Sequence, residues 1–453
     1  MEDITMRKIF QYIMLAVVTI VMASCTSDIE ETTATTGKSN VQLVVGEFPV
    51  FGDSQTRAIG TPDEGKTSWA EGDELLLEID NTSYGRHNAT FTYNGKSWEL
   101  TSGELVYLEG DPAYISHVYY APNYKWSNTS LMLKKGKVAG TDEYIEGTAQ
   151  ITPNGQAITV NFSGATRNYS RLRIATMPNK PITVTINKYT PAGSSNMKWD
   201  QNYALTSDEK GNAYLYGTFE NNSEVTVKYR EAALTTYTFS QATESAKSYA
   251  LDATVISANS AEEIKSAIEQ KVADGKTTIR LNLAPNAGTN EFMAIREAIK
   301  GAAPNDLGTI ELTIIGVETI PEEAFYKMLQ LKSVRMSDVK EIKKYAFKEC
   351  QYLTVVEAPS LNKLYSGAFK KCDQLSKLTF GPINYADARN WPIFEYITPN
   401  IDLILSDYQK EMIETDSYLY TANNDRDYAG SDEHNSKKFL GYEFKSITCR
   451  YPV

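Results

Sequence analysis

Apolar residues recur at a fixed interval along the last third of the chain. The pairs Ala324-Phe325, Ala346-Phe347 and Ala368-Phe369 follow one another every 22 residues (346 − 324 = 368 − 346 = 22). One such stretch cannot bury its own apolar side, so neighbouring stretches must stack and join each column into a continuous core. The pattern therefore predicts a solenoid of three full coils and a partial fourth. Other columns with this period are Leu331, Leu353 and Leu375; Leu312, Val334, Val356 and Leu378; Ile314, Met336, Ala358 and Phe380; Val317, Val339, Leu361 and Ile383; and Ile320, Ile342 and Leu364.

The segment before the repeats is predicted to cover the open end of the solenoid. Residues 260–263, Ser-Ala-Glu-Glu, form a capping-box sequence, and apolar residues then follow at helical spacing. Residues 279–283 alternate like a strand, and residues 292–299 return to the helical period. We expect an αβα cap over residues 253–308.

The chain beyond the repeats is less regular. Trp391 stands one period after the last Ala-Phe pair, and after it the register is lost. Strands at 401–405 and around 444–451 are expected to close the far end. Between them, residues 414–438 are polar and acidic, and they lack the Gly and terminal Glu of an EF-hand loop at the required positions. We interpret this segment as a solvated loop.

Residues 39–252 show a different pattern, in which short runs of alternating apolar and polar positions are separated by turn residues. Residues 41–45 have this alternation. Residues 91–98 predict a hairpin around an Asn94-Gly95 turn of type I′. Many short antiparallel strands at this spacing are typical of β-sandwiches.

The N-terminus has the features of an export signal. Arg7 and Lys8 precede a mostly apolar stretch at 9–22, whose 14 residues (22 − 9 + 1) fall short of the ~20 that a membrane-spanning helix needs. Residues 22–25, Met-Ala-Ser-Cys, resemble the lipobox of bacterial lipoproteins, with Met in place of the usual Leu. The resemblance implies cleavage before Cys25 and attachment of lipid to that residue. An ordinary secretory signal followed by a chance Cys is the alternative.

The residues after this signal predict how the protein is held at the cell. Residues 26–38 are rich in Thr and Ser and have no apolar periodicity, so we expect a flexible tether. Their acidic start, 27–31, resembles the tag that sends lipoproteins of some Gram-negative anaerobes to the outer face. We therefore expect a lipid-anchored protein of the outer membrane that is exposed at the cell surface.

The repeats contain sequence motifs that are typical of a known class of repeat protein. Residues 331–336 fit the strand pattern L-x-x-L-x-L of leucine-rich repeats, whose period is 20–29 residues. Val339 stands where the common type has Asn, and the Ala-Phe-x-x-Cys of 346–350 recurs at 368–372. These features resemble the BspA-like class of surface-antigen leucine-rich repeats over residues 309–405.

Four short motifs follow one another in the β-rich part. They are Thr56-Arg57-Ala58, Ser68-Trp69-Ala70-Glu71-Gly72-Asp73, Tyr119-Tyr120-Ala121-Pro122 and Val160-Asn161-Phe162-Ser163-Gly164. In this order they resemble fimbrillin-like proteins, the pilins and adhesins of Gram-negative anaerobes, although Gly164 replaces a frequent His. The resemblance implies two stacked β-sandwich subdomains. It also implies that an Arg-specific cut, for which Arg57 is the candidate, can free an N-terminal strand for pilus assembly.

Composition and charge argue against several functions. The net charge is −12 and the pI about 5.0, which disfavours nucleic acid as a partner. His87, His117 and His434 lie in separate segments, so we expect neither a His-rich metal site nor a His-based triad. The sequence has no P-loop, dinucleotide-binding, nucleophile-elbow or zinc-protease motif. We therefore predict a protein that is not an enzyme and that holds no metal and no cofactor.

Two cysteines share one column of the repeats. Cys350 and Cys372 are one period apart and align with Met328, so we expect both thiols to pack in the core. A disulfide between adjacent coils is an alternative. A redox or metal pair is a third interpretation, but no His or second Cys cluster accompanies them. Stability must come from packed cores, because the distant Cys449 completes no disulfide framework.

The repeats also differ in charge from the rest of the chain. Residues 331–378 carry ten Lys or Arg against five Asp or Glu, a local charge of +5 (10 − 5). Side chains between the core columns of the strands point outward. The expected outward rows are Glu311, Ser333, Val355 and Lys377, and Thr313, Arg335, Glu357 and Thr379. One interpretation is a solvated face with ion pairs such as Arg335 with Glu357; the other is an anion-attracting face that binds a ligand through Lys332, Arg335, Glu357 and Lys377.

These observations predict a multidomain, β-rich protein with antiparallel β-sandwiches, a short leucine-rich-repeat solenoid and an α/β cap. The expected parts are a signal peptide at 1–24, a tether at 25–38, sandwich subdomains at 39–156 and 157–252, the αβα cap at 253–308, the repeats at 309–405 and a C-terminal cap at 406–453. The predicted function is that of a surface adhesin or binding module for a host protein or glycan. A structural or accessory subunit of a fimbrillin-type pilus, bound to other pilus subunits, is the alternative.

Overall fold

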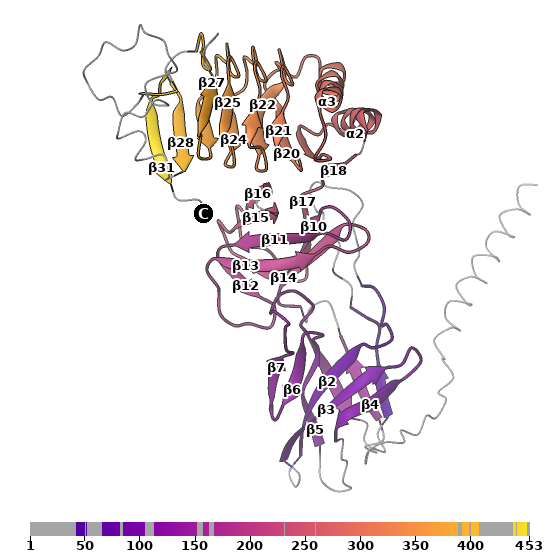
Figure 1. Ribbon diagram of the computed structural model, residues 1–453. Helices are drawn as coiled ribbons and strands as arrows, with labels where there is room; N and C mark the ends of the chain where they lie inside the picture. Colours follow the sequence, from indigo (N-terminus) through magenta and orange to yellow (C-terminus); the bar gives the residue numbers. More distant parts are fainter. Residues whose placement is uncertain are drawn as a thin grey trace, which may run out of the picture. The chain divides into compact units, whose positions relative to one another are not determined.

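The computed structural model divides into two compact β-rich units, each described below by itself (Figure 1). The first unit comprises residues 1–50, 64–138 and 143–167, and the second comprises 51–63, 139–142 and 168–453. The structure describes residues 42–49, 51, 66–81, 85–104, 113–151, 157–162, 167–230, 232–258, 260–387, 392–397, 400–406, 438–440 and 442–450. The predicted signal peptide, Cys25, the tether and Arg57 lie outside these residues.

A seven-stranded sheet forms the first unit. Its hydrogen-bonded order is β1 (Gln42–Val45), β9 (Ala157–Asn161), β8 (Ile145–Ile151), β5 (Ala113–Tyr120), β2 (Glu74–Asn81), β3 (Gly85–Tyr93) and β4 (Trp98–Gly103). The hairpin of β6 (Tyr124–Ser127) and β7 (Ser130–Leu133) is separate. β1 pairs in parallel with β9, and the other neighbours are antiparallel.

This first sheet curls around one core instead of pairing with a second sheet. Its two edge strands, β1 and β4, contact each other, and all seven strands contribute side chains to the same cluster, such as Leu43 from β1 and Leu100 from β4. The predicted boundary near residue 156 is wrong, because β9 belongs to this unit. Val160 of β9 lies opposite Val45 of β1 and is fully buried.

The predicted hairpin is confirmed, but its turn type is wrong. β3 and β4 pair antiparallel around a four-residue loop, residues 94–97. Gly95 has φ +91°, whereas Asn94 does not have the positive φ that a type I′ turn requires of both central residues. The Asn94 side chain instead accepts hydrogen bonds from the backbone N–H groups of Lys96 and Ser97 at 2.9 and 2.8 Å.

A two-sheet sandwich begins the second unit. One sheet has the order β12 (Tyr189–Pro191), β14 (Asn212–Phe219), β10 (Ser170–Ala175) and β17 (Ser248–Asp252). The other has the order β13 (Gln201–Thr206), β11 (Pro181–Ile186), β15 (Glu224–Tyr229) and β16 (Ala232–Thr238). Both sheets share one core, for example Ile174 and Leu215 from the first with Val184 and Val227 from the second. Because β16 and β17 end their sheets, each leaves one strand edge unpaired.

The solenoid of the second unit has two parallel sheets. The longer consists of β18 (Ile256–Ser257), β19 (Thr278–Asn282), β20 (Ile310–Ile315), β22 (Leu331–Met336), β24 (Val355–Ala358), β26 (Lys377–Phe380), β28 (Asp402–Ser406) and β31 (Ser446–Arg450). The shorter consists of β21 (Thr319–Ile320), β23 (Glu341–Ile342), β25 (Lys363–Tyr365) and β27 (Tyr385–Asp387). A small hairpin, β29 (Lys438–Phe439) with β30 (Tyr442–Glu443), accompanies the last strand.

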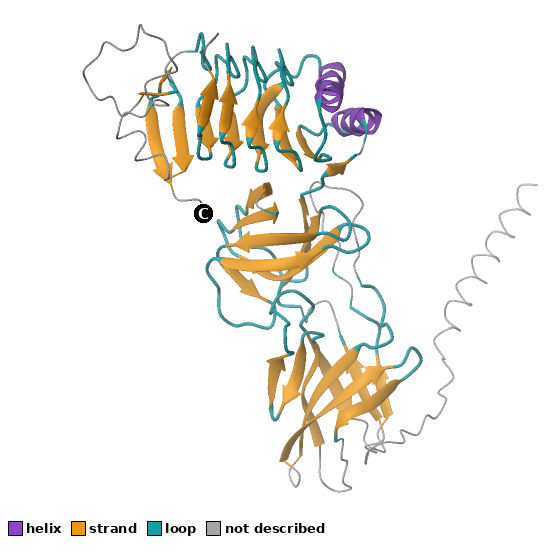
Figure 2. Cartoon of the chain, in the orientation of Figure 1, coloured by secondary structure: helices purple, strands orange, loops and turns teal. Residues whose placement is uncertain are grey.

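Helices α2 (Ala261–Ala273) and α3 (Thr289–Ala302) precede the repeats, with β19 between them (Figure 2). Ser260 caps α2 by accepting a hydrogen bond from the Glu263 N–H at 3.2 Å, as the capping-box sequence predicts. The buried residues Ile264 of α2 and Phe292 of α3 join the core cluster of the solenoid. No helix of the described residues is long and apolar enough to cross a membrane.

A ladder of phenylalanine rings runs through the core of the solenoid. Phe347 stacks on Phe325 and Phe369 with centroid distances of 5.1 and 5.3 Å. The next ring is Phe394, 5.7 Å from Phe369. It lies 25 residues on (394 − 369), because the fourth coil is three residues longer than the others. Trp391, which the 22-residue period marks, lies outside the described residues.

Candidate binding surfaces

The strands of the long solenoid sheet carry the two outward rows that the sequence predicts. Glu311, Ser333, Val355 and Lys377 lie opposite one another, and so do Thr313, Arg335, Glu357 and Thr379. We call the surface of β22, β24, β26 and β28 that bears these rows the strand face. Parallel hydrogen bonding fixes each side chain about 4.8 Å from its neighbour in the next strand. The surface is therefore a rigid array of side chains.

The four residues predicted to bind a ligand lie on the strand face, but most of their charge is compensated. The Arg335 Nε donates to Glu357 Oε2 at 3.0 Å, and the Lys332 Nζ donates to Glu311 Oε1 at 2.8 Å. Lys377 lies opposite Asp402 of β28 and has no ion pair within 4.0 Å among the described residues. The geometry therefore fits the first interpretation for Arg335 and Lys332, which form a solvated ion-paired surface. Lys377 is the predicted cation without an ion pair, although its charge helps to lower the pKa of Asp402.

The first strands of this sheet are covered by the sandwich, which the sequence analysis missed. Arg280 and Thr313 occupy the outward row yet are 5% and 4% exposed. The Arg280 Nε donates to the Leu234 carbonyl of β16, and Ile315 of β20 joins the core cluster of the sandwich. Ile315 is an apolar residue at an outward position of the strand, and this feature of the sequence could have indicated that another layer packs there. On β20 Glu311 stays partly exposed, and on β22 Ser333 is only 8% exposed, so the open part of the face begins with Lys332 and Arg335 of β22.

The unpaired basic residues of the repeats lie mostly away from the strand face. Lys344, Lys363 and Lys371 make no ion pair within 4.0 Å among the described residues. Lys344 contacts the ring of Tyr345 at 4.8 Å from the centroid, and Lys371 lies 6.0 Å from that of Tyr396. Apart from Lys377, the other basic residues of 331–378 do have acidic partners; besides Lys332 and Arg335 these are Lys340 with Glu318, Lys343 with Glu341, Lys348 with Glu349 and Lys370 with Glu395.

The two repeat thiols are packed in the core as expected. Cys350 and Cys372 are fully buried and unbonded to each other. Each S–H donates to a carbonyl of the adjacent coil, Cys350 to Phe325 O at 2.9 Å and Cys372 to Phe347 O at 3.0 Å. Burial raises the pKa of Cys350 to about 12 and raises that of Cys372 as well. Neither thiol is thus poised to act as a nucleophile.

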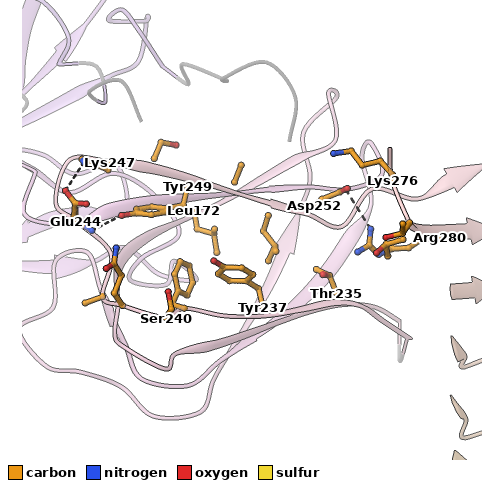
Figure 3. Close-up of a pocket in the computed structure, with 18 of the residues that line it drawn as sticks. Leu172, Thr235, Tyr237, Ser240, Glu244, Lys247, Tyr249, Asp252, Lys276 and Arg280 are labelled. Carbon is orange, nitrogen blue, oxygen red and sulfur yellow. Dashed lines mark hydrogen bonds and ion pairs between the residues drawn. The ribbon is translucent and has the colours of Figure 1, made fainter. Parts of the chain in front are cut away.

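A groove of about 740 Å³ lies between β16 and β17, the unpaired edges of the sandwich (Figure 3). It extends to the segment 275–280, which leads into β19. Tyr237 and Tyr249 line its middle, and Tyr237 is 48% exposed. The sequence does not reveal this groove, because its walls come from strands that alternate like all the others and meet only in three dimensions.

The two ends of the groove carry charged groups. Lys247 and Glu244 form an ion pair of 2.8 Å at one end, and Arg280 lies 3.9 Å from Asp252 at the other (Figure 3). Burial would raise the pKa of Asp252, but hydrogen bonds from Thr254 and the charges of Lys271 and Arg280 outweigh it and lower that pKa. Burial lowers the pKa of Arg280, and Asp252 offsets part of this shift. Both groups are ionised at neutral pH.

Among the described residues, no cluster of three or more His, Cys, Asp or Glu is arranged to hold a metal ion. His87 lies in β3 and His117 in β5, where the His117 Nδ1 is 2.8 Å from Glu146 Oε1. His434 lies outside the described residues. These residues therefore provide no basis for assigning a metal site.

Stacked coils with an L-x-x-L-x-L strand, a phenylalanine ladder and two parallel sheets define a leucine-rich-repeat domain. Residues 307–415, 109 of the 453 in the chain (415 − 307 + 1), match the family model of the BspA type leucine rich repeat region. The resemblance drawn from the sequence is thereby confirmed for the repeats. The comparison with curated protein sequences found no match. The resemblance to fimbrillin-like proteins stays a prediction.

Proposed function

We propose that this protein is a cell-surface adhesin or binding module whose repeat domain contacts a host protein or glycan. The observation that carries the proposal is the strand face, on which parallel pairing holds the exposed Lys377 and the partly exposed Arg335, Glu357 and Thr379 in fixed rows. BspA-like repeats are often binding modules of surface proteins. We assign the protein no catalytic activity and no cofactor.

The exposed end of the strand face is the proposed contact surface. The sandwich covers β19 and β20, so a ligand meets the strands from β22 onward. There Lys377 is exposed, and Arg335 with Glu357 forms a pair that can exchange its internal contact for a ligand group. Such surface charges contribute to the association rate and to specificity more than to affinity. Binding is therefore expected to weaken as salt rises.

The test compares two sets of substitutions with the same charge change in the full-length protein. The first replaces Lys332, Arg335 and Lys377 by Gln; the second replaces Lys344, Lys363 and Lys371 by Gln. Binding to an immobilised extracellular-matrix protein and to a glycan with acidic groups is measured over a salt series, with circular dichroism as the folding control. We expect about tenfold weaker binding for the first set and less than about twofold for the second. Equal losses, or a larger loss for the second set, would contradict the assignment to the strand face.

We further propose that Cys25 carries a lipid that anchors the protein in the outer membrane, with the repeats exposed at the cell surface. The support is the basic, apolar and small-residue order of residues 7–25. Cells expressing Cys25→Ala should not incorporate labelled palmitate into the protein, and the protein should leave the detergent phase. Retained labelling would refute the lipid anchor while leaving the binding proposal intact.

A further inference from the structure

The groove between β16 and β17 is bordered by unsatisfied strand edges. β17 pairs with β10 through bonds such as Arg171 N–H to Lys247 O and Ala253 N–H to Ala175 O. Because alternate residues of a strand face opposite edges, Ser248 and Ala250 turn their N–H and C=O groups to the open side. The groove can therefore offer both donors and acceptors from its backbone.

The side chains of the groove combine aromatic rings with hydroxyl and amide groups. Phe239 forms its base and packs edge-on against Tyr237 at 5.0 Å and Tyr249 at 6.0 Å between ring centroids. The polar lining consists of Thr235, Ser240, Gln241, Ser248, Thr277 and Thr278. A sugar ring has an apolar face of C–H groups and a rim of hydroxyls, so it matches a tyrosine ring flanked by such groups. The exposed ring of Tyr237 is available for this stacking.

The charge of the groove is positive although the chain is strongly acidic. Three cations, Lys247, Lys276 and Arg280, line it with two acids, Glu244 and Asp252, which gives +1 (3 − 2) against −12 for the chain. Lys247 is paired with Glu244, and Arg280 lies 3.9 Å from Asp252, so the surplus is the charge of Lys276, at the Arg280 end. At this end the buried Nη1 of Arg280 has no hydrogen-bond partner among the described residues. This end is suited to an anionic group.

An extended peptide fits the groove less well than a sugar does. A peptide that adds a strand needs a continuous free edge. The edge of β16 is interrupted, because the Leu234 carbonyl already accepts the hydrogen bond from the Arg280 Nε. Phe239 and Leu172 are buried at the base, so they leave no deep apolar hole for a large side chain.

We propose that this groove is a second binding site, separate from the strand face, for an acidic sugar. The sugar ring lies against Tyr237 and Tyr249, and its carboxylate or sulfate lies toward Lys276 and Arg280. The proposal does not depend on the function of the repeats.

The test uses isothermal titration of the full-length protein with three probes: methyl glucuronide, glucose 6-sulfate and neutral methyl glucoside. Either acidic probe should bind at least about tenfold more tightly than the neutral one, and the comparison of the two identifies the preferred acid group. Lys276→Gln should reduce the affinity for the acidic probe about tenfold and leave that for the neutral probe within about twofold. Tyr237→Ala should weaken all probes. The control variants are Lys210→Gln, which removes an exposed lysine of the same sandwich, and Tyr114→Ala, which removes an exposed tyrosine of the first unit.

Several results would overturn the proposal. Equal affinity for acidic and neutral probes would exclude the assigned acid site, and so would an unchanged preference in Lys276→Gln. Failure of all three probes would exclude a sugar groove, and an extended peptide that displaces them and binds more tightly would assign the groove to a peptide instead. Substitutions of Lys332, Arg335 and Lys377 should leave the titration unchanged.

Discussion

The solenoid and the sandwich of the second unit use strands of similar length but assemble them from very different distances along the chain. In the solenoid, Val334 pairs with Val356, 22 residues later. In the sandwich, Arg171 of β10 pairs with Ser248 of β17, 77 residues later (248 − 171). Neighbouring coils can therefore be recognised and formed from local sequence. The sandwich contains local hairpins such as β15 with β16, but it also depends on distant partners such as β10 with β17. The first region offers a regular surface, and the second offers an irregular groove.

The largest effect is expected from breaking the phenylalanine ladder. Phe347→Ala should lower the free energy of unfolding by about 3–5 kcal/mol, because it opens a cavity between two stacked rings. Urea denaturation followed by circular dichroism measures the change. Because each coil rests only on its neighbours, hydrogen exchange should increase in the repeats and remain unchanged in the sandwich strands. An equal increase of hydrogen exchange in the repeats and in the sandwich strands would contradict the claim that the two regions are stabilised separately.

In the first unit, loss of a buried ion pair should lower the stability. The Arg167 guanidinium donates from Nε and Nη2 to the two oxygens of Glu143 at 3.1 and 2.9 Å, and its side chain is fully buried. Arg167→Met leaves the carboxylate of Glu143 buried without this cation and should cost about 3 kcal/mol. Adding Glu143→Gln to Arg167→Met should recover part of the loss. If urea denaturation shows Arg167→Met to be as stable as the parent protein, the ion pair contributes nothing to the free energy of unfolding.

A smaller effect is expected at a glycine of the repeats. Gly367 has φ +63°, and a Cβ there would lie 2.4 Å from Cε1 of Tyr345. Gly367→Ala should therefore cost about 1–3 kcal/mol from backbone strain and displacement of the ring. Gly275→Ala is the matched control, since Gly275 has φ +73° with nothing within 4 Å, and it should cost about 1 kcal/mol. If both variants lose the same free energy of unfolding, the contact with the Tyr345 ring does not add to the cost of Gly367→Ala.

The smallest effect concerns the buried thiols and pH. The unfolded chain releases the Cys350 proton near pH 9, whereas the folded chain retains it until about pH 12. Between pH 9 and 12 the folded state holds this proton and the unfolded state does not. The contribution of Cys350 to the free energy of unfolding therefore falls as the pH rises from 9 towards 12. At pH 8 both thiols should react slowly with a thiol reagent in the folded protein and rapidly in denaturant. Rapid labelling of the native protein would contradict their place in the core.

The periodic part of the fold could be predicted from the sequence, and the rest only in outline. The apolar columns predicted the core and the outward rows, because every coil repeats the same pattern of apolar positions. Phe394 was missed because three added residues shift it out of register, although the pair Ile393-Phe394 resembles the earlier Ala-Phe pairs. The cover over Arg280 and the groove beside Tyr237 were missed because both depend on contacts between distant segments.

The most direct test of the account is hydrogen exchange of the full-length protein with and without a saturating matrix ligand. We expect slower exchange on binding in β22, β24, β26 and β28, the strands of the strand face. We expect no change in β19 and β20, which the sandwich packs against. Protection confined to the sandwich or to the first unit would contradict the claim that the repeat domain is the binding surface.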